Sequence, residues 1–432
     1  MKILFVSLGC DKNLVDSEKM LGMLQEKGYT FTDDEAEADV VVVNTCCFIG
    51  DAKEESINTL LQMGELKDSG QVKALIAAGC LAQRYREEIQ KEIPQVDAII
   101  GTTAIDEIVA ALEEILAGQK QNHYEDINAA PVTETNRVVT TGGHFAYLKI
   151  AEGCDKHCTY CIIPYARGRV RSLPVPTAVE QTRALAAEGY REIVVTGIEI
   201  SSWGQDLKNG ETLIDLLEAV CTAAPAVRIR LGSLEPRTIT EEFCRRAAAL
   251  PNLCPQFHLS MQSGCDDTLK RMNRKYDTTR YAQSVALLNQ YFDHPAVTTD
   301  LITGFPEETE EEFAQTLDFI RRCGFAQMHI FPYSVRPGTP AAKMRQVPKA
   351  VKEERARQAA AVAEALHRNY LAACVGAVYP VLFEQPKDGR YFGHAPNYME
   401  VLADGTDLHN QVRNVKVTGT DGASLLGELL ED

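Results

Sequence analysis

Three cysteines within eight residues constrain this chain more than any other feature. The segment AEGCDKHCTYC, residues 151–161, places Cys154, Cys158 and Cys161 at the spacing C-x3-C-x2-C. Three thiolates on one short loop can hold three irons of a 4Fe–4S cube and leave the fourth iron open. A closed zinc site would need a fourth ligand, and His157 stands where one loop cannot easily turn all four side chains inward. The spacing favours an iron–sulfur site over a zinc knuckle or unconnected thiols.

The cysteine loop follows an apolar run that predicts a strand. Cysteines at a strand's carboxyl end occupy the position where α/β barrels carry their chemistry. Six such strands, each followed by a helical pattern, are predicted between residues 144 and 373: Phe145–Ile150, Glu192–Thr196, Val227–Leu231, Gln256–Ser260, Val297–Ile302 and Gln327–Phe331. Six β/α repeats predict an open, incomplete (β/α)6 barrel, and a long helix, Lys349–Ala373, follows it.

Residues 1–125 also alternate between strand and helix. Apolar strands are predicted at Ile3–Val6, Val40–Asn44, Lys73–Ala78 and Ala98–Ile100, with helices at Ser17–Lys27, Lys53–Leu66, Arg84–Ile93 and Ile105–Leu116. Apolar strands separated by helices indicate a parallel sheet that is covered on both faces. A polar stretch at 126–143 reads as a linker between this domain and the barrel.

Three further cysteines follow strands of the first domain. Cys10, Cys46 and Cys80 each stand just after a predicted strand. Because the carboxyl ends of parallel strands lie at one edge of a sheet, these cysteines should converge and form a second metal site. Each could instead be an ordinary buried thiol. Cys47 could replace its neighbour as the ligand, and we choose Cys46.

Polar side chains follow several barrel strands. Turn chemistry explains most of the glycines and prolines there, but it explains Glu199, Glu235, Gln262 and Arg336 less well. These four could contact the amino, ribose and carboxylate groups of a cofactor, and each could also be structural. No catalytic side chain is predicted beyond the metal ligands.

The last part of the chain, residues 374–432, is rich in short strands. They are predicted at Val378–Glu384, Tyr391–His394, Met399–Leu402, Gln411–Gly419 and Ser424–Glu428. Five short strands predict a small β-barrel of a kind that often binds RNA. Four basic against nine acidic residues in 376–432 argue against a surface that grips phosphates.

Length, charge and cysteine content limit the classes of protein. At 432 residues the chain should form two or three domains, and no window approaches an apolar membrane span. The start lacks the features of a signal peptide, so a cytoplasmic location is expected. Thirteen cysteines in such a protein indicate metal or redox chemistry rather than disulfides. The net charge is −17, and residues 1–163 carry 14 basic and 27 acidic side chains.

The C-x3-C-x2-C loop after a strand, with Tyr160 before the last cysteine, resembles that of the radical S-adenosylmethionine enzymes. The resemblance implies that the open iron binds S-adenosylmethionine and that the cluster reduces it to a 5′-deoxyadenosyl radical. Two open three-cysteine sites on one chain resemble the methylthiotransferase branch of that family, and nearly the whole chain is covered. It implies an amino-terminal methylthiotransferase domain, a radical core, a terminal TRAM-like β-domain, two 4Fe–4S clusters and an electron donor such as flavodoxin or ferredoxin.

The family signatures indicate two different targets. SLGCDKNLVDSE (7–18), NTCCFIGDAKEESI (44–57) and YLKIAEG (147–153) resemble the RimO type, which implies β-methylthiolation of an aspartate on the twelfth small-subunit ribosomal protein. PYARGRVRS (164–172), RIRLGSLEP (228–236) and HLSMQSGCDDTLKRMNRKY (258–276) resemble the MtaB type, which implies 2-methylthiolation of N6-threonylcarbamoyladenosine beside the tRNA anticodon. The chain could thus be a hybrid of two family members.

The acidic first domain and β-end favour the basic ribosomal protein over tRNA. Candidates for attracting it are Glu384, Asp388, Asp404 and Asp407. Two other classes are less favoured. An electron-transfer protein would ligate each cluster with four cysteines and would not need a barrel. A zinc-structured RNA-binding module would show paired C-x2-C sites and a basic face.

Overall fold

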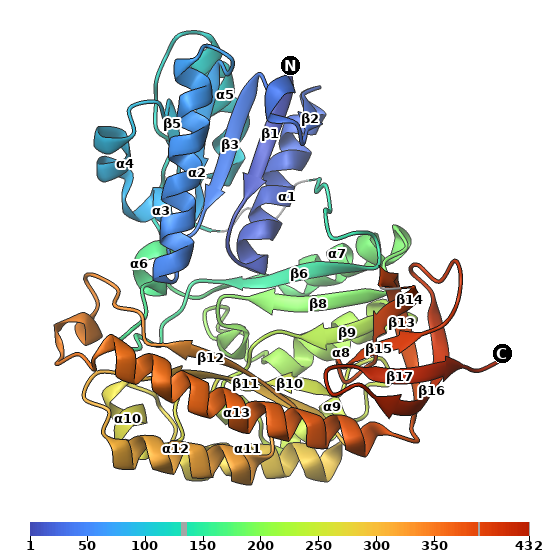
Figure 1. Ribbon diagram of the computed structural model, residues 1–432. Coiled ribbons are helices and arrows are strands. Elements are labelled where there is room, and N and C mark those ends of the chain that lie inside the picture. Colours follow the sequence, from blue (N-terminus) through green and yellow to red (C-terminus); the bar gives the residue numbers. More distant parts are fainter. Residues whose placement is uncertain (131–135, 388, 432) are drawn as a thin grey trace.

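The computed structural model describes residues 1–130, 136–387 and 389–431 of the chain. It comprises an α/β part at the amino terminus, a half-open barrel in the middle and a small β-barrel at the end (Figure 1). This is the predicted fold class, which is confirmed. The predicted linker, 126–143, includes residues 131–135, which lie outside the described residues.

The first part is built on a parallel five-stranded sheet in the order β2-β1-β3-β4-β5. Its central strand β3 has the sequence VVVVNT and is buried along its whole length, as a strand covered on both faces must be. One face packs against α1 and α5 and the other against α2, α3 and α4. The bounds are β1 (Lys2–Ser7), α1 (Asp11–Glu26), β2 (Thr30–Thr32), β3 (Val40–Thr45), α2 (Gly50–Asp68), β4 (Ala74–Ala78), α3 (Gly79–Arg84), α4 (Arg86–Glu92), β5 (Ala98–Ile100) and α5 (Ile108–Leu116).

Helix α1 begins at Asp11, six residues before the predicted start at Ser17. Its first two turns carry Asn13, Asp16 and Glu18, which are polar yet fully buried. Polar side chains at buried positions break the apolar periodicity that marks a helix in the sequence. They are buried because they meet the barrel, a contact that the local sequence does not reveal.

The middle part has six parallel strands. They form two hydrogen-bonded groups, β6-β8-β9 and β10-β11-β12. Two isolated bridges connect the groups, one between Ile229 and Leu253 and the other between Leu234 and Leu259. The short β7 pairs antiparallel with the end of β6. The predicted incomplete barrel is therefore confirmed. The strands are β6 (Phe145–Glu152), β7 (Arg171–Ser172), β8 (Glu192–Gly197), β9 (Arg228–Leu231), β10 (Gln256–His258), β11 (Ala296–Thr303) and β12 (Gln327–Pro332).

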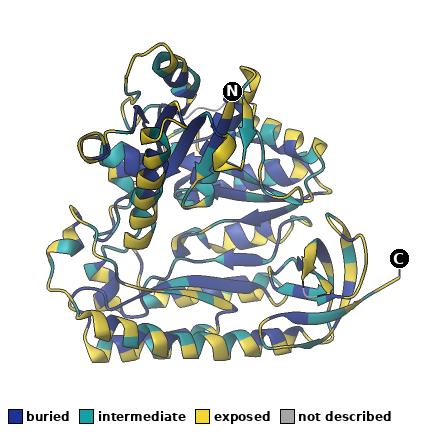
Figure 2. Ribbon diagram, turned by 45° about the horizontal axis from the view of Figure 1, so that its top comes forward, coloured by how far each residue is buried: buried dark blue, intermediate teal, exposed yellow. Residues whose placement is uncertain are grey.

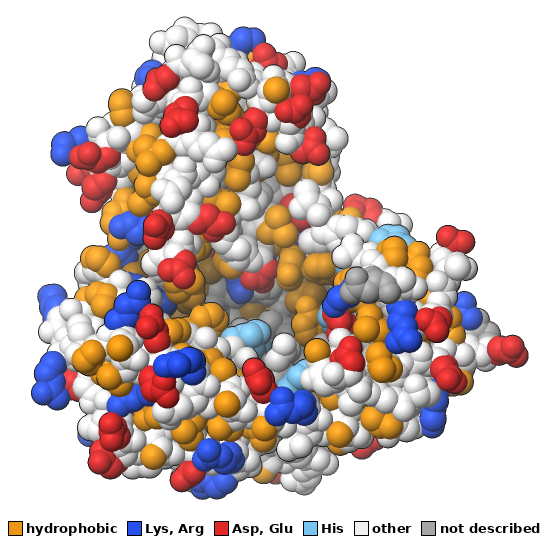
Figure 3. Space-filling model, viewed as in Figure 1, with side chains coloured by type: hydrophobic (Ala, Val, Ile, Leu, Met, Phe, Trp, Pro, Cys, Tyr) orange, Lys and Arg blue, Asp and Glu red, His pale blue; other side chains and the backbone are white. Residues whose placement is uncertain are grey.

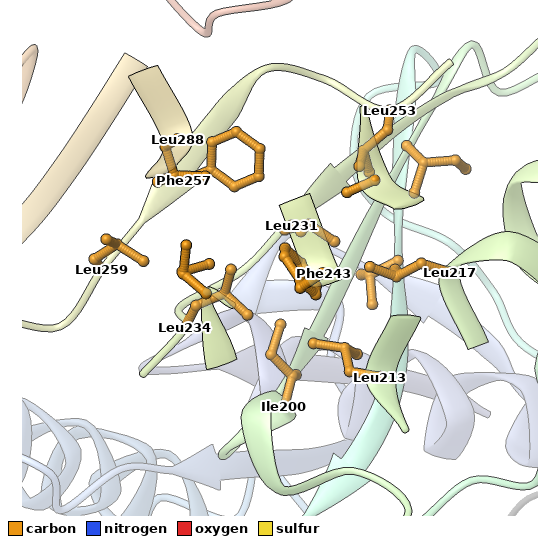
Figure 4. Close-up of a cluster of buried hydrophobic side chains, with 14 of the residues drawn as sticks. Ile200, Leu213, Leu217, Leu231, Leu234, Phe243, Leu253, Phe257, Leu259 and Leu288 are labelled. Carbon is orange, nitrogen blue, oxygen red and sulfur yellow. The ribbon is translucent and has the colours of Figure 1, made fainter. Parts of the chain in front are cut away.

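Amphipathic helices cover the outer face of these strands. Figure 4 shows part of the shared core, in which Leu213 and Leu217 approach strand residues such as Leu231. Helices α8 and α12 each begin with a capping box, from Thr212 and Thr309, which satisfies two backbone donors at each start. The helices are α6 (Ile163–Arg167), α7 (Val175–Ala187), α8 (Leu213–Ala223), α9 (Glu241–Ala247), α10 (Asp266–Arg271), α11 (Thr278–Tyr291), α12 (Glu310–Cys323) and α13 (Lys349–Cys374).

The long helix α13 runs from the half-open barrel to the β-end (Figure 1). There five strands close in the order β13-β14-β15-β17-β16, which confirms the predicted small barrel. Its core includes Tyr370 and Leu371 from α13, so the helix belongs to both parts. The strands are β13 (Val378–Lys387), β14 (Arg390–His394), β15 (Glu400–Ala403), β16 (Val412–Thr420) and β17 (Leu425–Leu429).

Two arginines of β9 attach the small barrel to the middle part. Arg228 donates to the carbonyls of Pro380 and His394, and Arg230 donates to that of Pro396. Both guanidiniums also contact the buried carboxylate of Glu192 at 2.6–2.9 Å. Figure 2 shows that the strands of the first part and most strands of the middle part are buried, whereas the small barrel and the outer faces of the helices are partly exposed. No helix among the described residues is long and apolar enough to cross a membrane.

Candidate functional site

Both cysteine triads line one cavity. It has a volume of about 480 Å³ and lies between the first domain and the carboxyl ends of the barrel strands. Figure 3 shows the molecule hollowed on this side, between the two parts. Its lining includes every residue predicted for the site: Cys10, Cys46, Cys80, Cys154, Cys158, Cys161, Glu199, Glu235, Gln262 and Arg336.

The first triad gathers at the edge of the parallel sheet. Cys10 caps the start of α1, Cys46 follows β3, and Cys80 lies in the first turn of α3. Gly9 has a φ of +92°, and a Cβ there would lie 2.6 Å from the Cβ of Cys46. Only glycine lets the loop that carries Cys10 approach Cys46 so closely.

Cys47 also lines the cavity, so the choice between the two neighbours stays a prediction. The backbone of Cys46 is held on both sides by Ser56, whose hydroxyl accepts from its N–H at 2.9 Å and donates to its carbonyl at 3.0 Å. Cys47 packs into the apolar layer between the sheet and α2. The fixed backbone and the position next to Gly9 favour Cys46.

Arg167, from α6, reaches the first triad across the domain boundary. Its side chain is 1% exposed and donates from Nε to Cys80 Sγ at 3.2 Å. Nη2 donates to Asn13 Oδ1 and Nη1 to Asp16 Oδ2, both at 2.6 Å. Burial raises the pKa of the Cys80 thiol to about 11, and the guanidinium acts in the opposite direction by favouring the thiolate.

The second triad lies on a tightly packed loop. Gly153 has a φ of +69°, and a Cβ on it would lie 1.8 Å from the carbonyl oxygen of Arg169. Arg274 donates from Nη1 to Cys158 Sγ at 3.2 Å, and the backbone N–H of Ile163 approaches Cys161 Sγ at 3.5 Å. Burial raises the pKa of the Cys161 thiol to about 11. N–H donors therefore point at a sulfur in each triad.

The donor sets suit iron–sulfur clusters better than single ions. Among the residues that the structure describes, the one group whose Cys, His, Asp or Glu ligand atoms lie within 4.8 Å of one another contains no cysteine. Each triad thus surrounds more space than one ion fills, as a cube requires. His157, the fourth ligand that a zinc knuckle would need, is exposed and does not line the cavity. The N–H···S contacts match the hydrogen bonds that tune cluster sulfurs.

Two of the four predicted cofactor contacts, Glu199 and Glu235, lie against Lys156. Its Nζ lies 2.5 Å from Glu235 Oε2 and 3.6 Å from Glu199 Oε2. Gln262 has a φ of +66°, a strained conformation for a residue with a side chain. Arg336 lies 4.7 Å over the Phe48 ring, and its Nε is buried without a hydrogen-bond partner among the described residues. An unpartnered buried donor suits a ligand, and the four assignments stay predictions.

Sequence reasoning missed several residues of this site. Arg167, Arg274, Lys12 and Lys156 have charged side chains close to cysteines, and no sequence pattern separates a buried arginine from an exposed one. The available signal was proximity, since Lys12 and Lys156 each stand two residues after a predicted ligand.

One predicted surface carboxylate is not available to a partner. Glu384 lies between two imidazoles, 3.2 Å from His144 Nε2 and in contact with His394, and its side chain is 16% exposed. The expectation that it presents its charge to a basic protein is therefore wrong, because the carboxylate is mostly buried between the two rings. Asp404 and Asp407 are exposed as expected, and Asp388 lies outside the described residues.

Comparisons with known proteins cover the whole chain. Residues 2–101 match an uncharacterized protein family, UPF0004, and residues 148–320 match the radical SAM superfamily. A protein of Lachnoclostridium phytofermentans is 41% identical, and the alignment covers 99% of each chain. A protein of Symbiobacterium thermophilum is 37% identical over 100% of this chain and 91% of its own length. Both are named ribosomal protein uS12 methylthiotransferase RimO.

Solved structures share the fold. TsrM, a radical S-adenosylmethionine methyltransferase from Kitasatospora setae, aligns with a TM-score of 0.56 and 14% identity, over 79% of this chain and 77% of its own. At this identity the likeness shows the architecture alone. The match to the L. phytofermentans protein runs through both the first domain and the barrel, so one family accounts for the segments with MtaB-like sequence as well. The chain belongs to the RimO family of radical S-adenosylmethionine methylthiotransferases.

Proposed function

We propose that this methylthiotransferase inserts its methylthio group into an aspartate of the twelfth small-subunit ribosomal protein, uS12. The observation that carries the proposal is the shared cavity: the two cysteine triads face one space in a chain that resembles uS12 methylthiotransferases along its length. The alternative target, N6-threonylcarbamoyladenosine in tRNA, rests on the MtaB-like barrel segments alone. A ribosomal substrate would also place the enzyme in the cytoplasm.

Cys154, Cys158 and Cys161 would hold the cluster that binds S-adenosylmethionine, and Cys10, Cys46 and Cys80 would hold the second. When bound, these groups supply the radical that removes hydrogen from a C–H carbon, together with the sulfur and the methyl group. Arg274 and Arg167 would hold one sulfur of each triad in place through their N–H···S contacts. Electrons would come from a small carrier such as flavodoxin or ferredoxin.

The chain's own charges can orient S-adenosylmethionine. Arg336 has a buried Nε with no partner in the part of the chain that the structure describes, and it suits the cofactor's carboxylate. Glu199 and Glu235 suit its amino and ribose hydroxyl groups, and Lys156 holds these two carboxylates at the cavity wall until a ligand arrives. Gln262 projects from a strained backbone position at the end of β10 toward the same space.

Lys12 is the cation that we assign to the substrate carboxylate. It lines the cavity two residues after Cys10, and its Nζ contacts Asp11 Oδ1 at 2.9 Å. Lys156 is engaged by two glutamates, Arg274 by a sulfur and Arg336 by the carbonyl of Tyr160. Lys12 contacts one carboxylate and can accept a second, and it lies next to the triad proposed to carry the sulfur.

Apolar side chains would keep water from the reacting groups. Phe48 and Ile49 from the first domain, and Ile162, Ile163 and Ile302 from the barrel, lie between the charged residues of the lining. Excluding water protects a reactive intermediate from side reactions and strengthens each electrostatic contact. The cavity lining thus combines a few charged side chains with apolar ones.

Mass spectrometry of a deletion strain tests the proposed target. Ribosomal proteins and tRNA nucleosides should be analysed from the same cells. We expect uS12 to lose its methylthio modification while the tRNA nucleosides keep theirs, and we expect the wild-type gene to restore it. Loss of methylthio-threonylcarbamoyladenosine with unchanged uS12 would overturn the ribosomal assignment and favour the tRNA target.

A further inference from the structure

Two histidines and an aspartate lie side by side on three adjacent strands. His258, Asp300 and His329 stand on β10, β11 and β12, and the register pairs Asp300 with His329 directly and His258 with Thr298, two residues from Asp300. The neighbours Phe257, Leu259 and Leu301 pack into the core beneath the outer helices. Because side chains alternate along a strand, the three polar residues share the inner face of the barrel.

The separations between these side chains suit one ion. His258 Nε2 lies 3.3 Å from Asp300 Oδ2, and His329 Nδ1 lies 3.2 Å from Asp300 Oδ1. Ligands bound to zinc at 2.0–2.1 Å with tetrahedral geometry are about 3.3 Å apart. One ligand atom from each of the three residues lies within 4.8 Å of the other two. No other such group occurs among residues 1–130, 136–387 and 389–431.

His258 provides a second, independent observation. Its side chain is 12% exposed, and Nε2 is buried without a hydrogen-bond partner in the described part of the chain, since its approach to Asp300 lacks hydrogen-bond geometry. The other ring nitrogen, Nδ1, lies 3.1 Å from Thr298 Oγ1. With the ring proton on Nδ1, donated to Thr298, Nε2 keeps its lone pair. This is the arrangement in which metal-binding histidines are usually held.

We propose that His258, Asp300 and His329 bind a divalent transition-metal ion of the zinc class, separately from the iron–sulfur clusters. Two imidazoles and one carboxylate are a donor set that such ions prefer, and three protein ligands leave a coordination position open. Asp300 lines the cavity of both triads, and His329 is 56% exposed, so an ion can reach the site from solvent. In Figure 3, histidine side chains lie in the hollow on this face. The proposal does not depend on which substrate the enzyme modifies.

Zinc uptake by the cluster-loaded, full-length protein tests the site. The protein is dialysed against buffered Zn²⁺ under anaerobic conditions, and zinc and iron are counted per chain. The wild type should gain one zinc with no loss of iron. His329→Ala should weaken zinc binding by more than about 100-fold, since losing a ligand should cost at least as much as losing a supporting contact. Because His329 is on an open surface, this substitution should not disturb folding.

A second group of two histidines and one carboxylate, at Glu384, provides a matched control for zinc binding. His144 and His394 both contact Glu384, but this group does not bring its ligand atoms together as the barrel group does. His144→Gln should therefore leave zinc uptake unchanged. His258→Ala, with its fold checked by circular dichroism, should behave as His329→Ala does.

X-ray absorption at the zinc edge separates the proposed ligands from thiols. Nitrogen and oxygen neighbours at about 2.0–2.1 Å, with no sulfur shell, support the site. A sulfur shell at about 2.3 Å would show zinc on cysteines and would overturn the proposal. Equal zinc uptake by the wild type and His329→Ala, or no uptake by the wild type, would overturn it as well.

Discussion

Arg167 Nε donates to Cys80 Sγ at 3.2 Å, although the two residues belong to different domains. Arg167 also contacts Asp16 from the first domain and Glu152 from the barrel. Lys149 contacts the same two carboxylates, so two cations and two anions share one buried site. The first cysteine triad therefore depends on the barrel for part of its surroundings.

Replacing Arg167 should damage both stability and the first triad. Arg167→Met leaves buried carboxylates short of a counter-charge, which should lower the free energy of unfolding by about 3–5 kcal/mol. It also removes the donor to Cys80. Urea unfolding and iron analysis measure the two effects. The control Arg321→Met removes an exposed contact with Asp318, and its free energy of unfolding should differ from that of the wild type by no more than about 1 kcal/mol. Equal effects of the two substitutions would contradict the role of the buried network.

Substitution of a cysteine in either triad should remove half of the iron that the protein contains. Cys46→Ala should remove about four of eight irons and leave reductive cleavage of S-adenosylmethionine at the other cluster. Cys158→Ala should also remove about four irons but should abolish that cleavage. Cys323→Ala, outside the cavity, is the control and should keep all the iron. If Cys47→Ala loses iron while Cys46→Ala does not, the neighbour is the ligand.

The loop of the second triad should not tolerate a side chain at Gly153. Gly153→Ala places a Cβ 1.8 Å from the Arg169 carbonyl, so the loop must move and the cluster of Cys154, Cys158 and Cys161 should be lost. Gly28→Ala is a matched control, since Gly28 has a φ of +83° and open space around its Cβ position. In that control the free energy of unfolding should fall only by about 1–2 kcal/mol, the cost of holding alanine in a left-handed backbone conformation, and the protein should keep its iron. Full iron content in both variants would show that the contact can relax.

Lys12 should affect the substrate rather than the cofactor. Lys12→Met should raise KM for uS12 by about 10- to 100-fold, the value of a hydrogen bond to a charged group. Cleavage of S-adenosylmethionine without substrate should stay unchanged. Lys275→Met provides a control at another lysine of the cavity lining. A loss of cofactor cleavage in Lys12→Met, with KM unchanged, would refute the assignment.

The contact between β9 and the small barrel should weaken in acid. Burial opposes ionisation of Glu192, but Arg230 and Arg228 hold its pKa at about 2. A carboxylate with a lowered pKa stabilises the fold above its ordinary pKa of about 4.3, and this contribution, about 3 kcal/mol, is lost as the pH falls toward 2. Glu192→Gln should therefore be less stable than the wild type above about pH 5, and the difference should shrink in acid. A difference that does not vary with pH in urea unfolding would contradict this.

Most strands could be predicted because they are buried and therefore consist mainly of apolar residues. The predicted bounds of β3 and of the six barrel strands differ from the observed ones by at most two residues. Most of these strands are apolar runs, although β12 is largely exposed. Cys10, Cys46 and Cys80 could be grouped because strand ends in parallel sheets converge, and Cys154, Cys158 and Cys161 because of their C-x3-C-x2-C spacing. The prediction of one common cavity for both triads was beyond reach, since it depends on how two domains pack.

Buried polar residues were the part that the sequence concealed. The first turns of α1 were not predicted because they contain the polar residues Asn13, Asp16 and Glu18. Arg167 stands in an arginine-rich segment, and nothing in the sequence distinguishes it from the neighbouring arginines. His258, Asp300 and His329 are separated by up to 71 positions, and only the strand register brings them together. Such contacts follow from tertiary structure and leave no periodic signal.

Glu18 adds a further consequence to the contact between the domains. Its carboxylate is fully buried and is met at 2.7 Å by Arg137 Nε and by the backbone N–H of Thr140, both from the segment that precedes β6. Opening the two domains would separate this charge, and that of Asp16, from cationic partners across the boundary, so these ion pairs oppose opening. Ion pairs across the boundary between the domains therefore stabilise the arrangement that brings both triads to one cavity. A substrate side chain has to enter that cavity to reach either triad.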